Sequence, residues 1–185
     1  MKSINSKKGF TIIEVVLVLA IGGLIFLMVF LGFPALQRTQ NDTTRRNDLA
    51  RFGTQLQQYS SNNRGKVPTA DKWQDFVKDY LAKVAPGTNG FEVEGNEFVD
   101  PDGQPYQVQF VADLKNATDQ TLSSTVKSLA NAPFGQDVGT DIKAHTIYVY
   151  TYAGCDGENI VKSTGARRVA FQYKLENAGV YCGTN

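Results

Sequence analysis

The chain has 185 residues, and its 19 basic and 18 acidic side chains give a formal net charge of +1 at pH 7. This length suits one domain plus a long helix, and the near-zero charge gives no global field that would attract nucleic acid. The sequence has one histidine, no Cys-x-x-Cys pair, no phosphate-binding glycine loop with lysine and no Gly-x-Ser-x-Gly elbow. We therefore expect neither an enzyme nor a cofactor.

Residues 10–36 form an apolar stretch that is interrupted only by the carboxylate of Glu14 and the small polar Thr11. A helix of about 20 apolar residues spans a bilayer, so this stretch predicts a membrane helix. A conventional secretory signal fits less well, because its apolar core would have about 7 to 15 residues. The basic residues that precede the stretch place the N-terminus in the cytoplasm and the rest of the chain outside; they are Lys2, Lys7 and Lys8.

The carboxylate of Glu14 has no obvious partner within its own helix. A charged group at the centre of a membrane helix costs about 2.5 to 3.5 kcal/mol on insertion scales, and less near the interface. The next basic residue along the helix is Arg38, far beyond the spacing at which two side chains of one helix can pair. Glu14 either lies near the headgroups or takes a cation from elsewhere.

The segment KKGFTIIE, residues 7–14, resembles the prepilin signature of type IV pilins and pseudopilins, and the resemblance extends to about Tyr59. It implies that a prepilin peptidase cuts after Gly9 and N-methylates Phe10. Cleavage would create an α-amino group that is mostly charged at neutral pH and that stays basic when methylated. We expect this amine of Phe10 to pair with Glu14 of a neighbouring subunit during assembly.

These features divide the chain into four parts. The expected parts are a cleaved basic leader (1–9), an apolar transmembrane and assembly helix (10–36), an amphipathic continuation of that helix (37–63) and a globular α+β head (64–185). The fold class that we predict is α+β and pilin-like, with the long N-terminal helix packed against an antiparallel β-sheet.

Four residues weaken the apolar helix through backbone entropy or through a missing amide; they are Gly22, Gly23, Gly32 and Pro34. Such interruptions are tolerated in membrane helices. The family resemblance implies a second interpretation, in which the segment between a glycine and the proline unwinds in a filament.

Beyond Pro34 the pattern stays helical but becomes polar. The apolar residues Leu49, Phe52, Leu56 and Tyr59 recur at steps of three and four, which predicts one stripe facing the head. Ion pairs between Asp42 and Arg46 and between Asp48 and Arg51 fit helical spacing. We expect Arg45, Arg46 and Arg51 on a solvated or intersubunit face, and we expect the helix to end near Gly65.

The head begins with a short helix that we expect to be capped by Thr69. Its buried side should carry Trp73, Phe76, Val77, Tyr80 and Leu81. The segment Asp100-Pro101-Asp102-Gly103 predicts a type I turn, and with Gln104-Pro105-Tyr106 it resembles an element of pseudopilin heads. Its two carboxylates also invite a calcium interpretation, but the EF-hand ligand pattern is absent and we expect only a turn.

The remaining elements are predicted from alternation and periodicity. We expect strands at 106–110, 146–152, 169–175 and 180–182, a helix over 119–131 and a loop over 132–141. In the second strand Ile147 and Val149 should face one side and the tyrosines the other, so both of its faces are occupied. Asn177 and Gly179 suit the hairpin that joins the last two strands.

The two cysteines, Cys155 and Cys182, both lie in the exported part of the chain. An exported pair tends to close, so we expect a disulfide that contributes about 3 to 4 kcal/mol. A metal site would need more ligands than these thiols and His145 supply. A bridge here also resembles the disulfide-bounded C-terminal region of type IV pilins.

The resemblance implies a structural subunit of a type IV pilus-like surface filament. Its implied partners are identical subunits, a prepilin peptidase and methyltransferase, a pilus assembly ATPase with its platform, and the membrane that holds the subunit before assembly. Two alternatives stay open: a pseudopilin of a type II-like secretion system or minor pilin, and an uncleaved single-span anchor for a binding module. The turn element favours a pseudopilin, and the cysteine pair favours a pilin.

Overall fold

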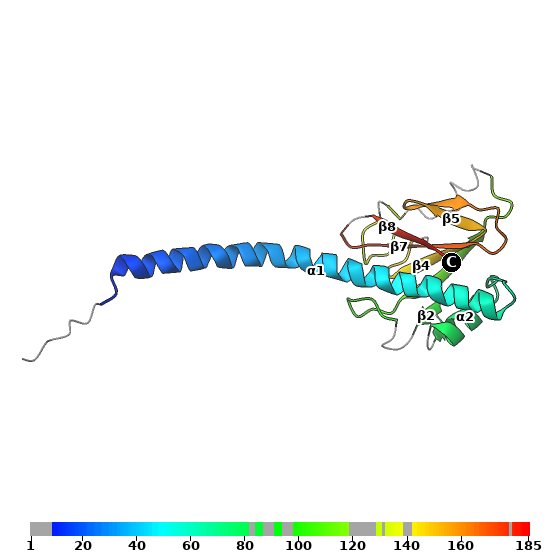
Figure 1. Cartoon of the computed structure of the whole chain (residues 1–185), viewed down its shortest axis with the longest axis horizontal. Coiled ribbons are helices and arrows are strands. Elements are labelled where there is room, and N and C mark those ends of the chain that lie inside the picture. The colour runs from blue at the N-terminus through cyan, green and yellow to red at the C-terminus, as the bar shows by residue number, and fades with distance from the viewer. Residues whose placement is uncertain are drawn as a thin grey trace, which may run out of the picture. The chain divides into compact units, whose positions relative to one another are not determined.

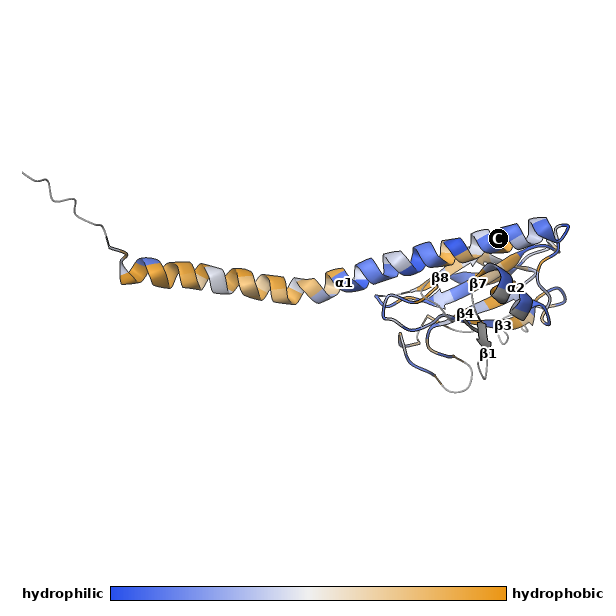
Figure 2. Cartoon of the chain, turned by 90° about the horizontal axis from the view of Figure 1, so that it is seen from below, coloured by the Kyte–Doolittle hydropathy of each residue, from blue (hydrophilic) through white to orange (hydrophobic). Residues whose placement is uncertain are grey.

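The structure is a computed structural model that describes residues 9–81, 84–86, 91–93, 98–118, 129–130, 132–138, 142–177 and 179–185. The chain divides into two compact units, Met1–Thr39 and Gln40–Asn185. Helix α1 (Ile12–Asn62) contributes to both of them (Figure 1). Its first half is almost wholly apolar and its second half mostly polar, as the change from orange to blue in Figure 2 shows.

The second unit is an α+β head, as predicted. Within its described residues, six strands form one sheet in the order β1-β2-β3-β4-β7-β8, and β5 pairs with β6 in a second sheet. The strands are β1 (Val84–Pro86), β2 (Phe91–Val93), β3 (Gln107–Asp113), β4 (Thr146–Thr151), β5 (Ala153–Asp156), β6 (Asn159–Lys162), β7 (Val169–Lys174) and β8 (Val180–Thr184).

The large sheet is mostly antiparallel, with one exception. Strands β3 and β4 run parallel, with Val108 opposite Ile147 and a bulge between Phe110 and Ala112. A parallel pair needs a long crossover, and the chain between these strands, residues 114–145, provides one. The predicted antiparallel sheet is thus confirmed, with this one parallel pair as an exception.

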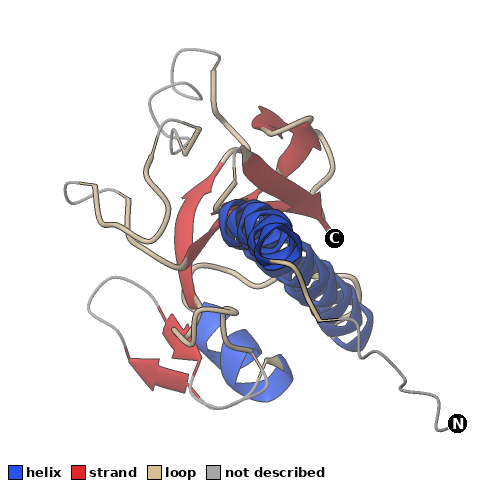
Figure 3. Ribbon diagram, turned by 90° about the vertical axis from the view of Figure 1, so that its left-hand side faces the viewer, coloured by secondary structure: helices blue, strands red, loops and turns tan. Residues whose placement is uncertain are grey.

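Apolar side chains fill both faces of the sheet. On one face, Ile147, Val149 and Phe171 meet the buried stripe of α1, where Leu49, Phe52 and Leu56 are at most 1% exposed. On the other face, Tyr148 and Tyr150 join a second buried cluster. Burying each such side chain contributes about 1.5 to 3 kcal/mol. The predicted stripe on α1 and the predicted two-sided burial of β4 are confirmed, and Figure 3 shows α1 beside the strands.

The first residues of the head differ from the sequence prediction. Helix α2 (Trp73–Tyr80) begins four residues after Thr69, and its N-cap, Lys72, makes no side-chain capping hydrogen bond. Thr69 does not cap the helix, because its hydroxyl bonds to the carboxylate of Asp71 and its carbonyl accepts from the amide of Lys72 in a turn. The aromatic core residues expected here, Trp73 and Phe76, are fully buried.

Three other predicted features can be compared with the structure. Helix α1 ends as expected, with Gly65 at φ 76° and its amide donating to the carbonyl of Ser60 at 2.7 Å. The turn at 100–103 is present, since the amide of Gly103 donates to the carbonyl of Asp100 at 2.8 Å. The helix predicted over 119–131 lies outside the described residues, apart from Leu129 and Ala130.

Candidate functional site

The start of α1 brings together the residues of the predicted processing site. Gly9 and Phe10 precede the helix, and Glu14 lies in its first turn. The carbonyl of Thr11 accepts from the amide of Glu14 at 3.1 Å, and the Thr11 hydroxyl lies 3.4 Å from the Glu14 carboxylate. Thr11 therefore occupies the N-cap position of a Ser/Thr-x-x-Glu pattern, a role that the sequence analysis missed.

This placement changes the electrostatics of Glu14. A carboxylate in the first turn faces the positive end of the helix dipole, which stabilises it by about 0.3 to 1 kcal/mol. That is less than the 2.5 to 3.5 kcal/mol that a charge costs at the centre of a membrane, although the cost falls toward the interface. The helix terminus thus offsets only part of the cost of Glu14, and a further cation would still be favourable.

The apolar side chains that follow Glu14 lie open. Between Phe10 and Leu36 the large apolar residues are 48 to 85% exposed, so nothing in the described residues covers them. Among the described residues, α1 is the one helix long and apolar enough to cross a membrane. Apolar surface of this extent needs lipid or other protein around it.

The four expected weak points lie within an unbroken helix. A β-carbon built on Gly22, Gly23 or Gly32 would meet nothing within 4 Å, and Pro34 lies inside α1. The glycines are therefore not required by close packing within the chain. Unwinding at these positions stays a prediction.

A buried ion network centred on Arg45 ties α1 to the head. Arg45 is fully buried, and its Nε and Nη2 donate to the two oxygens of Asp100 at 2.7 Å each. Its Nη1 donates to Asp42 and to Glu176, both at 3.0 Å. The guanidinium also lies 4.1 Å from the centroid of the Phe134 ring, a cation–π contact. The expectation that Arg45 lies on a solvated or intersubunit face is wrong.

The carboxylates around Arg45 are saturated by hydrogen bonds. Asp100 also accepts from the hydroxyl of Tyr173 at 2.7 Å and from the amide of Asp102 at 3.1 Å. Asp42 accepts from the amides of Glu176 and Asn177 at 2.9 Å each, so it does not form the predicted pair with Arg46. Every charge taken from water here has a replacement partner, as a buried network requires.

The network shifts the acidity of its members in directions that follow from these contacts. Burial alone would lower the pKa of Arg45, but its bonds to Asp100 and Glu176 raise it. Burial alone would raise the pKa of Asp100, but its bonds to Arg45 and Tyr173 lower it. Burial and the nearby Asp100 raise the pKa of Tyr173. At neutral pH, Arg45 and Asp100 are thus held as an ion pair.

The sequence held a signal for this network. Arg45 precedes Leu49, Phe52 and Leu56 at steps of four, three and four, so it continues the apolar stripe of α1. The acidic partner was not predictable in the same way, because Asp100 lies 55 residues further along the chain. Its turn motif indicated a loop and gave no sign of burial.

The carboxylates of the turn do not form a good cation site. The ligand atoms of Asp100, Asp102 and His145 lie within 4.8 Å of one another. Both oxygens of Asp100 already accept two hydrogen bonds each, which leaves Asp102 and His145 as available ligands. Two protein ligands fall short of the 6 to 8 oxygens that calcium takes.

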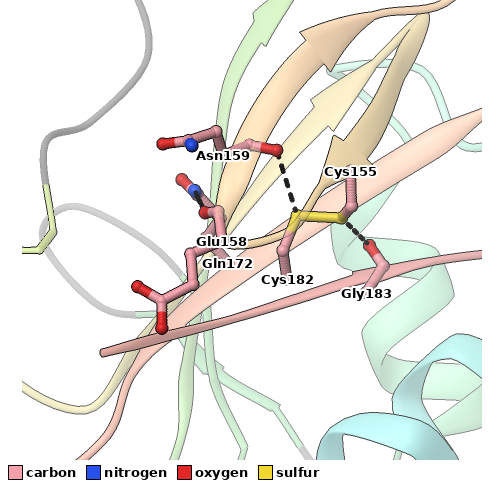
Figure 4. The surroundings of a disulfide bond; sticks show 6 residues. All are labelled: Cys155, Glu158, Asn159, Gln172, Cys182 and Gly183. Carbon is pink, nitrogen blue, oxygen red and sulfur yellow. Dashed lines mark hydrogen bonds between the residues drawn. A yellow bond between two sulfur atoms is a disulfide. The ribbon is translucent and has the colours of Figure 1, made fainter. Parts of the chain in front are cut away.

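The expected disulfide joins Cys155 in β5 to Cys182 in β8, with 5.9 Å between the two Cα atoms (Figure 4). Cys155 lies in a strand of the small sheet, which the sequence analysis did not predict. The bridge therefore fastens the β5–β6 hairpin to the edge strand of the large sheet.

An apolar helix of membrane length and an α+β head with a mostly antiparallel sheet define a pilin-like protein. A comparison with protein families adds a more specific finding: residues 4–30 match the prokaryotic N-terminal methylation motif. That motif is the signature of type IV prepilins, and it points to a structural protein that is anchored in the membrane and processed by a prepilin peptidase. No curated protein and no solved structure matches the chain.

Proposed function

We propose that this chain is a structural subunit of a type IV pilus-like surface filament. One observation carries the proposal: the methylation motif at residues 4–30 contains Gly9, Phe10 and Glu14, and it coincides with the start of α1, whose first half is apolar and exposed. An ordinary anchor needs neither the cleavage site nor the acid. A subunit that leaves the membrane to join a helical bundle uses both.

The assembly chemistry follows from the first turn of α1. Cleavage after Gly9 gives Phe10 a free amine, whose pKa near 8 keeps it mostly charged at neutral pH, and N-methylation leaves it basic. This amine pairs with Glu14 of the adjacent subunit. It supplies the positive charge that Glu14 still needs, because the helix dipole offsets only part of the cost of its carboxylate. The exposed apolar residues of 10–36 then pack against those of neighbouring subunits inside the filament.

This function sets the partners and the location of the protein. Before assembly it is a single-span membrane protein with a cytoplasmic N-terminus, and its partners are the peptidase that methylates Phe10 and an ATP-driven assembly platform. After assembly it is extracellular and surrounded by identical subunits. Nucleic acid is not among the expected partners, because the net charge is only +1. No catalytic residue is assigned.

Two measurements test the proposal. Mass spectrometry of the N-terminus should find a chain that begins at methylated Phe10, and an intact Met1 would instead favour an uncleaved anchor. Glu14→Ala should lower the yield of sheared surface filaments at least tenfold, because the helix then offers no acid to the neighbour's amine. Val15→Ala, a truncation at the next residue, is the control and should keep the normal yield. Normal filaments from Glu14→Ala would exclude the pairing.

A pseudopilin or minor pilin is the second candidate. It is supported by the segment Asp100 to Tyr106, the turn that resembles pseudopilin heads and that bonds to α1 through Arg45. Such a subunit would form a short periplasmic fibre or the tip of a pilus. Abundance in sheared surface material separates the two: a major pilin dominates that fraction, and a pseudopilin is almost absent from it.

A further inference from the structure

A groove in the head combines apolar walls with a basic rim. It has a volume of about 470 Å³, and its walls are the segment after α1 and the loop before β7. The lining residues include three cations, Arg64, Lys66 and Arg167, and one anion, Asp113, which gives 3 − 1 = +2. Cavities of about 300 to 1,000 Å³ are typical of binding sites in proteins. The groove is suited to an acidic ligand.

Part of the basic rim packs against the end of α1. A β-carbon built on Gly65 would lie 2.7 Å from the guanidinium carbon of Arg167, so that side chain packs directly on the backbone at the end of α1. The carbonyl of Arg167 accepts from the side-chain amide of Asn185 at 2.8 Å. A cation that is already ordered loses less conformational entropy when it pairs with an anion.

The same head carries an acidic projection. The hairpin turn formed by the end of β5 and the two residues after it contains Asp156, Gly157 and Glu158, all exposed, and it has no basic residue. A β-carbon on Gly157 would meet nothing within 4 Å, so there is open space at that position, whereas the carboxylate of Glu158 lies against the backbone of Gly179. The disulfide at Cys155 holds the base of this turn against the large sheet, and Figure 4 shows Glu158 directed away from the bridge. The turn has a formal charge of −2.

The groove and the acidic turn are displaced from each other along β7. The groove lies at the first residue of β7, since Arg167 lines it and Val169 begins the strand. Strand β5 leaves the groove after Tyr152 and extends four residues, about 13 Å at 3.3 Å per residue. There the carbonyl of Glu158 accepts from the side-chain amide of Gln172 at 2.6 Å. The acidic turn thus lies toward the far end of the strand.

Two complementary surfaces at separate places on one head fit a head-to-tail contact, which can repeat without closing and generate a helical filament. We propose that the acidic turn Asp156–Glu158 of one subunit binds the basic groove of Arg64, Lys66 and Arg167 in a second copy of this chain. The groove favours this occupant over nucleic acid, because its net charge of only +2 matches the −2 of one turn and not the run of phosphates along a nucleic acid. This inference rests on the proposed filament function.

The contact is tested by charge reversal in the full chain, with assembled material measured in the sheared surface fraction. The variant Lys66→Glu with Arg167→Glu, and the variant Asp156→Lys with Glu158→Lys, should each lower assembly at least fivefold. The four substitutions together should restore it to within twofold of the unaltered chain. As the control for the reversal of the acidic turn, Asp75→Lys with Asp79→Lys makes the same change in net charge on exposed positions of α2 and should assemble normally.

Three results of this assay would contradict the contact or the function on which it rests. Unchanged assembly in either reversal, or no recovery in the combined variant, overturns the inference, and the groove would then bind a different partner. Recovery of assembly in the combined variant requires that its heads are folded. Thermal unfolding of each variant in detergent checks the fold. If a reversal prevents folding, the neutral pairs Lys66→Gln with Arg167→Gln and Asp156→Asn with Glu158→Gln replace it and should each lower assembly at least twofold. Failure of the unaltered chain to assemble would instead contradict the proposed function.

Discussion

The residue that most determines the packing of the head is a buried arginine. Arg45 replaces its hydration with contacts to three carboxylates and one aromatic ring, on segments far apart in the sequence. A buried ion pair adds little stability compared with an apolar replacement of the whole network. The removal of one member is different, because it leaves the other charge unpaired away from water.

Asp100→Asn should therefore destabilise the head by about 3 to 5 kcal/mol. The asparagine keeps the size of the side chain but leaves the guanidinium of Arg45 without its closest anion. Urea unfolding of the full chain in detergent, followed by tryptophan fluorescence from the buried Trp73, measures the change. Asp102→Asn, in the same turn but 34% exposed, is the control and should change the free energy of unfolding by less than about 1 kcal/mol. Equal effects would contradict a specific role for Asp100.

The lowered pKa of Asp100 gives that residue a defined pH dependence. A carboxyl group whose folded pKa lies below its unfolded value, about 3.9, stabilises the fold above that value. The contribution is lost as the pH falls through the folded pKa. Asp48 and Asp102 act in the opposite direction, because burial raises the pKa of each and acid then adds stability.

The comparison of the unaltered chain with Asp100→Asn isolates the contribution of Asp100. The difference in free energy of unfolding should be constant from pH 7 to about pH 5, and it should shrink as the pH falls below about 4. Urea titrations at each pH measure this difference. A constant difference down to pH 2.5 would contradict the assigned direction.

At the scale of elements, the close approach of α1 to the sheet depends on a glycine. A β-carbon on Gly53 would lie 3.3 Å from the ring of Phe171 and 3.3 Å from the carbonyl of Thr184. Glycine inside a helix costs about 1 kcal/mol relative to alanine, which is tolerated here because even a β-carbon would contact the sheet tightly.

Gly53→Leu should lower the stability of the head by about 1 to 3 kcal/mol, since the larger side chain forces α1 and β7 apart. Ala50→Leu is the matched control, because Ala50 lies on the exposed face of the same helix. Thermal unfolding by circular dichroism measures both variants. If the two variants unfold at the same temperature, the tight packing at Gly53 does not determine the stability of the head.

The disulfide is the second constraint at this scale. Cys155 and Cys182 are separated by 27 residues, and closing such a loop stabilises the fold by about 3 to 4 kcal/mol in the chain-entropy model. Replacing both cysteines by alanine should lower the free energy of unfolding by that amount. The urea midpoint of the double variant, compared with that of the oxidised unaltered chain, measures it. The reduced unaltered chain should match the double variant, and a double variant as stable as the oxidised chain would exclude a stabilising role.

The elements show which features the sequence could predict. The α1 stripe at Leu49, Phe52 and Leu56 and the alternation in β4 were predictable, because each depends on a local period. The direction of β3 relative to β4 was not, since nothing local to either strand specifies it. The start of α2 was missed because a Thr-x-Asp turn competes with helix capping for the same side chain. Processing at Gly9 and Phe10 stays a prediction.

At the scale of the whole molecule, the core belongs to one unit only. Among the described residues, those of α1 that are buried begin at Asp42, within the unit Gln40–Asn185. The described residues of α1 before Asp42 expose apolar surface, and none of them is buried within the chain. The stability of the head should therefore be independent of the membrane segment, and association should depend on it.

Deletion of residues 1–39 tests this division of roles. The remaining chain, residues 40–185, keeps Arg45, the apolar stripe and the disulfide, so it should fold and unfold with a free energy within about 1 kcal/mol of the full chain in detergent. It should also be monomeric at micromolar concentration, because the apolar surface that requires other molecules has been removed. Urea unfolding and analytical ultracentrifugation measure the two properties. A head that unfolds more easily without its first helix half would mean that the membrane segment contributes to the fold itself. Stable association of the isolated head would mean that contacts between heads are enough for assembly without the apolar helix.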